Sequence, residues 1–129
     1  MEVRVAVDTN RLTDLFRDDA GLAAQLGAYN EVWLPLIVVA EIKAGFHGGQ
    51  HLHRNHRMLI AFLQRPTAGI LLPDEETANY YARLFVQLKR SGKPIPDNDL
   101  WIVALCLQHN LALISRDKHF DRIPQLMRA

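Results

Sequence analysis

Cysteine is almost absent from this sequence, and that scarcity excludes several kinds of protein. Cys106 is the only cysteine in 129 residues, so the chain cannot form an internal disulfide or a cysteine-based metal cluster. No apolar run approaches the roughly 20 residues that a helix needs to cross a bilayer. The first residues also lack the charged and then apolar leader of a secreted protein. We therefore expect a cytoplasmic protein that makes no contact with a membrane.

Internal repeats, low-complexity tracts and linkers rich in glycine, serine or proline are also lacking. Apolar residues make up 49% of the chain and charged residues 22%, which is typical of a folded protein with a core of its own. We expect one domain over residues 1–129.

Acidic residues are missing from a long central stretch. No Asp or Glu lies between Ile42 and Pro73, although the net charge of the whole chain is only +1. The stretch holds cations, among them Lys43, Arg54 and Arg57, and the acids lie before and after it. Such a segregated distribution suits a polyanionic ligand. A solvated helix face explains any single basic run equally well.

Short apolar segments alternate with segments of helical periodicity along the chain. Strands are predicted over residues 3–7, 32–35, 69–73 and 111–115, and helices over residues 9–16, 18–29, 36–46, 51–64, 74–89 and 98–109. Asp74 is predicted to cap the long helix that it precedes. This alternation favours an α/β fold in which helices cover both faces of a parallel sheet, an α/β/α sandwich.

Two acids lie just beyond predicted strands. Asp8 directly follows residues 3–7, and Asp117 comes shortly after residues 111–115. Because ligands gather beyond the carboxyl ends of parallel strands, we expect both side chains at the same edge of the sheet.

Two further acids lie on predicted helices. Glu41 has apolar neighbours such as Ile37 and Val38, so its carboxylate is expected to be half-buried, and a buried charge must be paired or bound to a metal. Asp99 opens a helix. Each acid also has an ordinary explanation, because Asp8 and Asp99 can cap helices and Glu41 can pair with an arginine.

Four acids at such positions are hard to explain by capping alone. Carboxylates that meet at one point repel one another unless a hard cation lies among them. With a single cysteine and no histidine at zinc-ligand spacing, the donor set is predicted to be oxygen only, which favours Mg²⁺, or Mn²⁺, over zinc. The substrate that joins such an ion to a basic rim is a phosphodiester.

At these residues the sequence resembles the PIN domain and, more narrowly, the VapC-type toxins of bacterial and archaeal toxin–antitoxin pairs. The motifs that carry the resemblance are "VDTN" at Asp8, "VVAEIKAG" around Glu41, "PIPDNDLWIVALCLQHNLALISRDKHF" across residues 94–120, and "IPQL" after it. The resemblance implies a PIN-like α/β/α sandwich with a short-stranded parallel sheet, and a Mg²⁺-dependent endoribonuclease.

The resemblance also implies a set of site residues. The catalytic and metal-binding acids are Asp8, Glu41, Asp99 and Asp117; the supporting residues are Thr9, Asn10, Asp97 and Ser115, of which Asp97 either substitutes for Asp99 or assists it. The residues expected to contact the RNA backbone are Arg11, Lys43, Arg54, Arg57, Arg116 and Lys118.

The sequence departs from the family pattern in places. His119 stands where many relatives have an acid, which weakens the fourth corner of the site. Arg11 follows "DTN" where an apolar residue is more usual, and it is a candidate contact for a substrate phosphate or an antitoxin carboxylate. A last edge strand is expected to be short or missing. The histidines of the central stretch, at positions 47, 51, 53 and 56, are expected on a mobile surface loop with no catalytic function.

Partners implied by the resemblance are an RNA substrate, a cognate VapB-like antitoxin that covers the active site, and a second copy of the chain in a homodimer. Apolar residues near the N-terminus, from Leu12 to Leu26, are expected in the core, although either contact could also use them. Two other functions stay open. One is a phosphatase with Asp8 as nucleophile, which would need a second Asp where Asn10 stands; the other is a degenerate domain that only binds a partner.

Overall fold

The computed structural model describes residues 3–129. Within that range the strands form one parallel sheet in the order β3–β2–β1–β4. Its strands are β1 (Arg4–Val7), β2 (Glu31–Pro35), β3 (Ala68–Leu71) and β4 (Ala112–Ile114). The parallel sheet predicted from the sequence is therefore confirmed.

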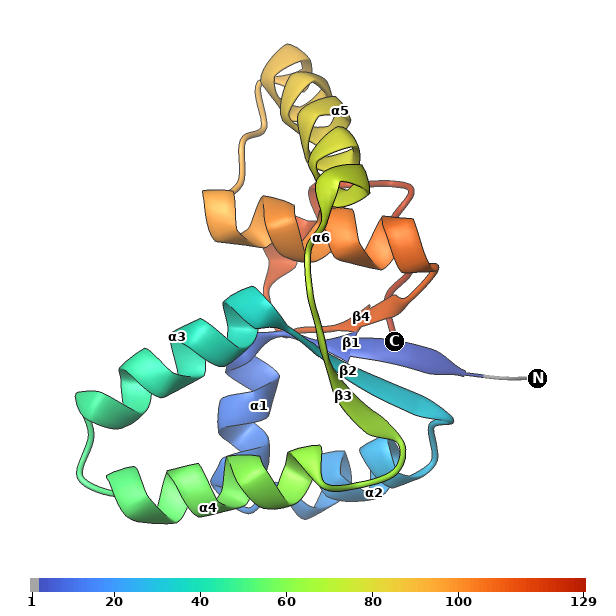
Figure 1. Cartoon of the computed structure of the whole chain (residues 1–129). Coiled ribbons are helices and arrows are strands. Elements are labelled where there is room, and N and C mark those ends of the chain that lie inside the picture. The colour runs from blue at the N-terminus through green and yellow to red at the C-terminus, as the bar shows by residue number, and fades with distance from the viewer. Residues whose placement is uncertain (1–2) are drawn as a thin grey trace.

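Helices cover both faces of the sheet (Figure 1). The helices are α1 (Thr9–Phe16), α2 (Ala20–Gly27), α3 (Leu36–His47), α4 (Leu52–Leu63), α5 (Glu75–Ser91) and α6 (Asp97–His109), and a 3₁₀ helix, η1, covers Lys118–Arg122. Helices α1, α2 and α4 lie on one side of the sheet, and α5 and α6 lie on the other (Figure 1). Helix α3 extends from the carboxyl end of β2 and contacts both α1 and α6. The α/β/α sandwich is confirmed.

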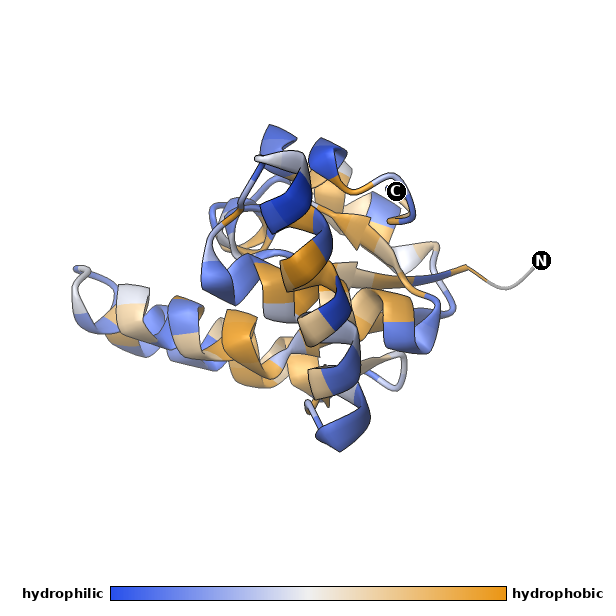
Figure 2. Cartoon of the chain, turned by 90° about the horizontal axis from the view of Figure 1, so that it is seen from above, coloured by the Kyte–Doolittle hydropathy of each residue, from blue (hydrophilic) through white to orange (hydrophobic). Residues whose placement is uncertain are grey.

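The core follows from the apolar segments of the sequence. In the central strand β1, Val5, Ala6 and Val7 are fully buried, as expected for a parallel strand that is covered on both faces. Helix α6 is buried along residues 102–106, and Figure 2 shows hydrophobic ribbon segments at the centre with hydrophilic ones around them. Burial raises the pKa of the Cys106 thiol to about 12, so this cysteine is an inert core residue.

Apolar side chains near the N-terminus belong to the core. Leu12 and Phe16 of α1 and Leu22 and Leu26 of α2 are all buried. They form no exposed surface for an antitoxin or a second copy of the chain.

Element boundaries differ from the sequence prediction at a few ends. The second helix begins at Ala20, because Asp18 has a positive φ of 65° and the Asp19 side chain caps Leu22. Asp74 caps α5, as predicted. The last edge strand is reduced to a single bridge between Leu113 and Arg128. Among residues 3–129, no helix has the length and the apolar character to cross a membrane.

Two glycines provide a matched test of the sheet packing. A Cβ at Gly69 of β3 would lie 2.8 Å from the ring of Trp33 on the paired strand, whereas a Cβ at Gly45 of α3 meets no atom within 4 Å. We expect Gly69→Ala to lower the free energy of unfolding by about 1–3 kcal/mol through overpacking. Gly45→Ala is expected to raise it by about 0.5–1 kcal/mol through helix propensity. Urea unfolding measures both, and an unchanged stability in Gly69→Ala would contradict the close packing of β2 and β3.

Candidate active site

The adjacent strands β1 and β4 bring two polar residues together. Val7 pairs with Ile114 across the strands, so Asp8 and Ser115 leave the sheet side by side. Ser115 Oγ donates a hydrogen bond to Asp8 Oδ2 (2.6 Å), and the Thr9 backbone N–H donates one to Asp8 Oδ1 (2.8 Å). Asp8 is therefore both the N-cap of α1 and a buried, oriented carboxylate at the carboxyl edge of the sheet.

Glu41 reaches the same edge from α3. Its carboxylate is half-buried, and Thr9 Oγ1 donates a hydrogen bond to Glu41 Oε1 (3.0 Å). Among residues 3–129, Glu41 forms no ion pair with an arginine or lysine, so the ordinary explanation of this acid lacks support there.

Asp97 and Asp99 both lie in the first turn of α6, but their side chains have different neighbours. Pro96 is the N-cap residue and no side chain caps this helix, so neither acid serves as a cap. The Tyr81 hydroxyl donates a hydrogen bond to Asp97, and the Tyr81 ring stacks on Trp101 with 4.5 Å between ring centroids. The Asp97 carboxylate is thus engaged by Tyr81 of α5, whereas the Asp99 carboxylate lies beside the residues that follow β4.

The segment after β4 contributes Asp117 and a residue outside the predicted site, His119. The Asp117 side chain is half exposed, whereas that of His119, on η1, is mostly buried. His119 Nε2 lies 2.7 Å from Asp99 Oδ2, and Nδ1 lies 3.4 Å from Asp117 Oδ1. Ligand atoms of Asp99, Asp117 and His119 are close enough to hold one metal ion. His119 was not among the donors expected from the sequence, because no histidine stands at zinc-ligand spacing there, but the fold brings it close to Asp99 and Asp117.

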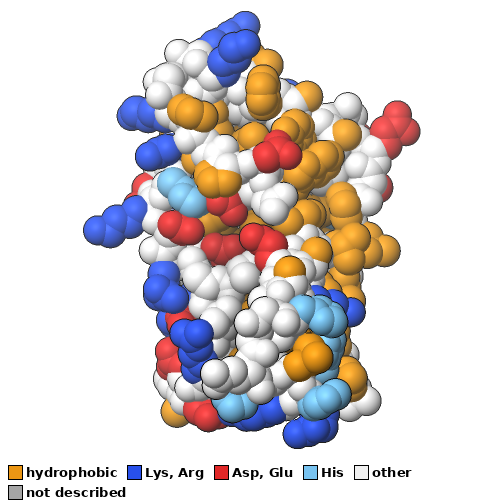
Figure 3. All heavy atoms as spheres, turned by 90° about the vertical axis from the view of Figure 1, so that its left-hand side faces the viewer, with side chains coloured by type: hydrophobic (Ala, Val, Ile, Leu, Met, Phe, Trp, Pro, Cys, Tyr) orange, Lys and Arg blue, Asp and Glu red, His pale blue; other side chains and the backbone are white. Residues whose placement is uncertain are grey.

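An open cavity of about 600 Å³ joins these side chains. The residues that line it are Asp8, Thr9, Asn10, Glu41, Pro96, Asp97, Asn98, Asp99, Asp117 and His119. Figure 3 looks onto this end of the molecule, where acidic side chains gather in a hollow and hydrophobic side chains lie beside them. The four acids expected to converge do line one cavity, together with three of the four predicted supporting residues.

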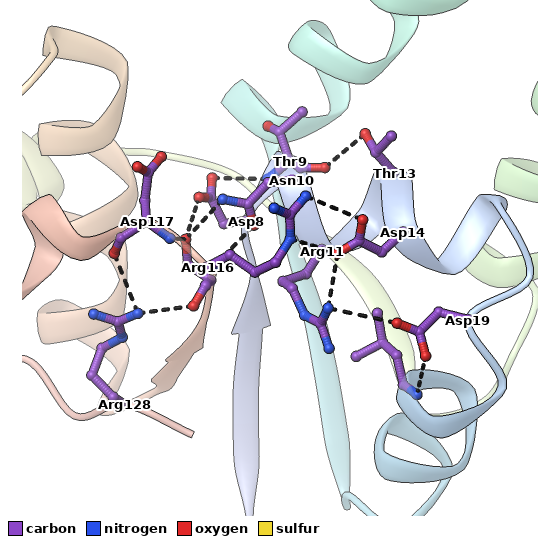
Figure 4. A network of polar contacts seen from close by, with 12 residues as sticks. Asp8, Thr9, Asn10, Arg11, Thr13, Asp14, Asp19, Arg116, Asp117 and Arg128 are labelled. Atoms are coloured by element: carbon purple, nitrogen blue, oxygen red, sulfur yellow. Dashed lines mark hydrogen bonds and ion pairs between the residues drawn. The ribbon is translucent and has the colours of Figure 1, made fainter.

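Polar contacts hold the floor of this cavity in place (Figure 4). Asn10 Nδ2 donates a hydrogen bond to Ser115 Oγ (3.2 Å), and the Arg116 backbone N–H donates one to Asn10 Oδ1 (3.2 Å). Arg128 Nη2 donates to the Ser115 carbonyl oxygen (2.9 Å). Ser115 is thus held by Asn10 through its hydroxyl and by Arg128 through its carbonyl oxygen, and it orients the Asp8 carboxylate.

Comparison with known proteins places this arrangement in a family. The family model of the PIN domain matches residues 5–126. The chain belongs to the PIN domain family. Ribonuclease VapC1 from Haemophilus influenzae strain R2866 is 30% identical over 125 residues, which cover 93% of this PIN domain chain and 92% of that protein. The resemblance to VapC-type proteins that the motifs indicated is confirmed.

Solved structures agree with this assignment. VapBC-1 from nontypeable Haemophilus influenzae is 26% identical with a TM-score of 0.85, and the match covers 98% of this chain and 97% of that one. VapBC2 from Rickettsia felis, bound to a DNA fragment from their promoter, is 24% identical with a TM-score of 0.89 and 98% coverage of both chains. The second likeness is one of fold alone.

Carboxylates in this PIN domain disfavour one another's ionisation. Burial raises the pKa of Asp8, although the hydrogen bonds from Ser115 and Thr9 oppose this. Burial, and then the charge of Asp8, raise the pKa of Asp99 to about 6, against the opposing effect of His119. Acids with raised pKa values at the end of a cavity are typical of a functional site.

Cations surround the acids, but several are already paired. Arg11 Nη1 and Arg116 Nε both contact Asp14 Oδ2, at 2.8 and 2.7 Å. Arg54 lies 3.3 Å from Asp18. The remaining cations proposed to contact RNA, Lys43, Arg57 and Lys118, are exposed.

The histidines of the central stretch lie on α3 and α4 or at the start of α4, not on the mobile loop expected from the sequence. His47 ends α3, and His56 on α4 packs edge-on against Phe46 with 5.2 Å between ring centroids. None of the four lines the acidic cavity.

Asp99 provides a test of the repulsion between carboxylates. Its pKa of about 6 in the folded chain exceeds the ordinary value of 3.8. Without metal, the folded state therefore loses stability as the pH rises from about 4 to about 6, because the unfolded chain ionises Asp99 more easily. We expect Asp99→Asn to flatten this loss and to raise the free energy of unfolding at pH 7.5 by on the order of 1–2 kcal/mol. Urea unfolding in EDTA at pH 4 and pH 7.5 measures the effect.

The exposed residue Asp18 supplies a matched control. Asn is tolerated at its positive φ of 65°, so Asp18→Asn should leave the pH dependence unchanged. Equal stability of wild type and Asp99→Asn at pH 7.5 would contradict the electrostatic strain described for the site.

Proposed function

We propose that this PIN domain is a divalent-metal-dependent endoribonuclease and the toxin of a toxin–antitoxin pair. The observation that carries the proposal is the convergence of Asp8, Glu41, Asp99 and Asp117 on one cavity. Its support from relatives is the similarity to Ribonuclease VapC1 over nearly the whole chain.

The residues of the cavity fit a divalent cation. Burial and the charge of Asp117 raise the pKa of Asp8, and burial and the charges of Asp8 and Glu41 raise the pKa of Asp99, so a cation among these carboxylates would relieve the repulsion. His119 Nε2 is a buried nitrogen without a hydrogen-bond partner among the described residues. Carboxylate oxygens are the ligands that Mg²⁺ and Mn²⁺ prefer.

Asp99 and Asp117, with His119, have ligand atoms close enough to share one ion, and Asp8 and Glu41, which line the same cavity, complete the proposed set of acids. An ion held there supplies a Lewis acid for hydrolysis of a phosphodiester. Ser115 orients Asp8 through the hydrogen bond of 2.6 Å, and Thr9 orients Glu41 through that of 3.0 Å. These contacts fix the carboxylates before substrate arrives, which is the condition for efficient positioning.

The RNA backbone is proposed to lie against the exposed cations near the acids. Arg116 and Lys118 flank Asp117 in sequence, and Lys43 follows Glu41 on α3. Single-stranded or looped RNA fits such an open site, because its bases and backbone are accessible. A phosphatase with Asp8 as nucleophile finds no support, since the Asn10 amide is engaged by Ser115 and Arg116.

Removal of single charges tests the nuclease. We expect Asp8→Asn and Asp99→Asn to lower cleavage of RNA at least about 100-fold, with the fold intact because Asn caps α1 as well as Asp does. Asp18→Asn, outside the cavity, should cleave like wild type, and EDTA should stop cleavage until Mg²⁺ or Mn²⁺ is restored. Mapping RNA 5′ ends after expression of each variant measures the effect. Full cleavage by Asp99→Asn would contradict the assignment, and an inactive wild type would favour a domain that only binds.

A VapB-like antitoxin is the proposed protein partner. This follows from the likeness to VapBC-1. The cytoplasm is the proposed location, because the toxin, its antitoxin and the RNA substrate would meet there.

The second proposed partner is another copy of the chain. An apolar hollow beside the acids is lined by Leu36, Ile37, Ala40, Pro73 and Trp101 among others, and Leu72 nearby is 62% exposed. An exposed apolar surface of this kind is typical of a protein contact.

Charge placed on this apolar surface tests the homodimer. We expect Leu72→Glu to convert a dimer to a monomer, because a carboxylate would be desolvated at the contact. Ile60→Glu, at an equally exposed apolar residue of α4 (56%), should leave the dimer intact. Light scattering across a concentration series measures the mass. A wild-type monomer at high concentration would contradict the homodimer.

A further inference from the structure

The two ring nitrogens of His119 have different surroundings. Nε2 is buried and faces Asp99 Oδ2 at 2.7 Å, yet it has no hydrogen-bond partner among residues 3–129. Nδ1 faces Asp117 Oδ1 at 3.4 Å. The ring packs against the buried Phe120 with 4.6 Å between ring centroids, and the Arg128 guanidinium lies over the Phe120 ring. His119 is therefore held in one place with Nε2 turned towards Asp99.

This arrangement matches the way proteins prepare a histidine for a metal. A metal-bound histidine usually directs its second ring nitrogen at a carboxylate, which fixes the tautomer and the orientation of the ring. In the neutral tautomer that carries its proton on Nδ1, Nε2 is free to present its lone pair to a metal ion beside Asp99. A divalent ion bound here would take the place of the proton that can otherwise lie between these two atoms, 2.7 Å apart.

We propose that His119 is a nitrogen ligand of the divalent ion through Nε2, and that it shifts the preference of the site from Mg²⁺ towards Mn²⁺. Asp117 is then a positioning residue that acts through His119. The inference rests on the proposed metal-dependent function, and it concerns which ion this chain selects.

Ligand chemistry gives the direction of the shift. Mg²⁺ prefers oxygen ligands in a strict octahedron and gives up water reluctantly. Imidazole nitrogen suits first-row transition ions, of which Mn²⁺ also accepts the carboxylates that form the rest of the site. A nitrogen donor in place of an acid therefore costs Mg²⁺ more than it costs Mn²⁺.

Pulsed electron paramagnetic resonance of the Mn²⁺-loaded protein tests the bond itself. We expect wild type to show ¹⁴N coupling from a directly bound imidazole, and His119→Gln to lose it. His53→Gln, at an exposed histidine of α4, should keep the coupling. Asp117→Ala should keep it with an altered magnitude, because the ring loses its orienting carboxylate. A wild-type spectrum without ¹⁴N coupling would overturn the proposal, and it would identify His119 as an internal counter-ion of the two carboxylates.

Competition between the two ions tests the selectivity. Calorimetry gives the dissociation constants of Mg²⁺ and Mn²⁺ for wild type and for His119→Glu, a variant that puts an oxygen donor back at this position. We expect the ratio of the Mg²⁺ constant to the Mn²⁺ constant to be at least about tenfold lower in His119→Glu than in wild type. Circular dichroism checks that each variant is folded. An equal ratio in wild type and His119→Glu would overturn the proposal.

RNA cleavage separates failure of this inference from failure of the proposed function. A wild type that cleaves RNA with either ion but lacks the ¹⁴N coupling overturns the inference alone. A wild type that binds neither ion overturns both.

Discussion

Repulsion between carboxylates at one edge of a parallel sheet is the constraint on which this structure depends. Asp8 and Asp99 enter the cavity from the end of β1 and from α6; the charge of Asp117 raises the pKa of Asp8, and the charge of Asp8 raises that of Asp99, in both cases after burial. A fold that keeps them together must hold them with contacts made elsewhere. The hydrogen bonds of Ser115 and Thr9 do this for Asp8 and Glu41, and the buried strand β1 anchors the whole group.

Sheet topology explains why residues far apart in sequence serve one site. The pairing of β1 with β4 places Asp8 beside Ser115, and the same loop then delivers Asp117 and His119. Helix α3 leaves β2 at the same edge and carries Glu41. Helix α6 presents Asp99 from the opposite layer. The chemistry is therefore assembled from both layers of the sandwich, where the carboxyl ends of the strands meet.

Local periodicity and the positions of strand ends were enough to predict much of this protein from its sequence. Apolar periodicity and β-branched runs predicted the strands and helices. The geometry of parallel sheets, in which the carboxyl ends of the strands meet at one edge, predicted that the four acids converge. The left-handed backbone at Asp18 was not foreseen, since it is a local conformation that a helical pattern does not reveal. His119 was noted as a departure from the family pattern, but its contact with Asp99 was not foreseen, because the short 3₁₀ turn after β4 brings it back towards Asp99 and no regular spacing indicates that turn. The contact of Tyr81 with Asp97, which separates Asp97 from Asp99, is a contact through space between two helices.

The position of Asp14 would affect how strongly the protein binds a polyanion. Arg11 and Arg116 both rest on this one carboxylate, so each arginine near the cavity already has an anion as neighbour. A nucleic-acid phosphate that binds Arg116 replaces Asp14 rather than filling an empty place beside a bare cation. Such an exchange would release fewer small ions than the number of nearby arginines implies, and it would make the binding of a polyanion correspondingly less sensitive to salt. A polyanion that is to bind these arginines would therefore have to compete with the Asp14 carboxylate for them.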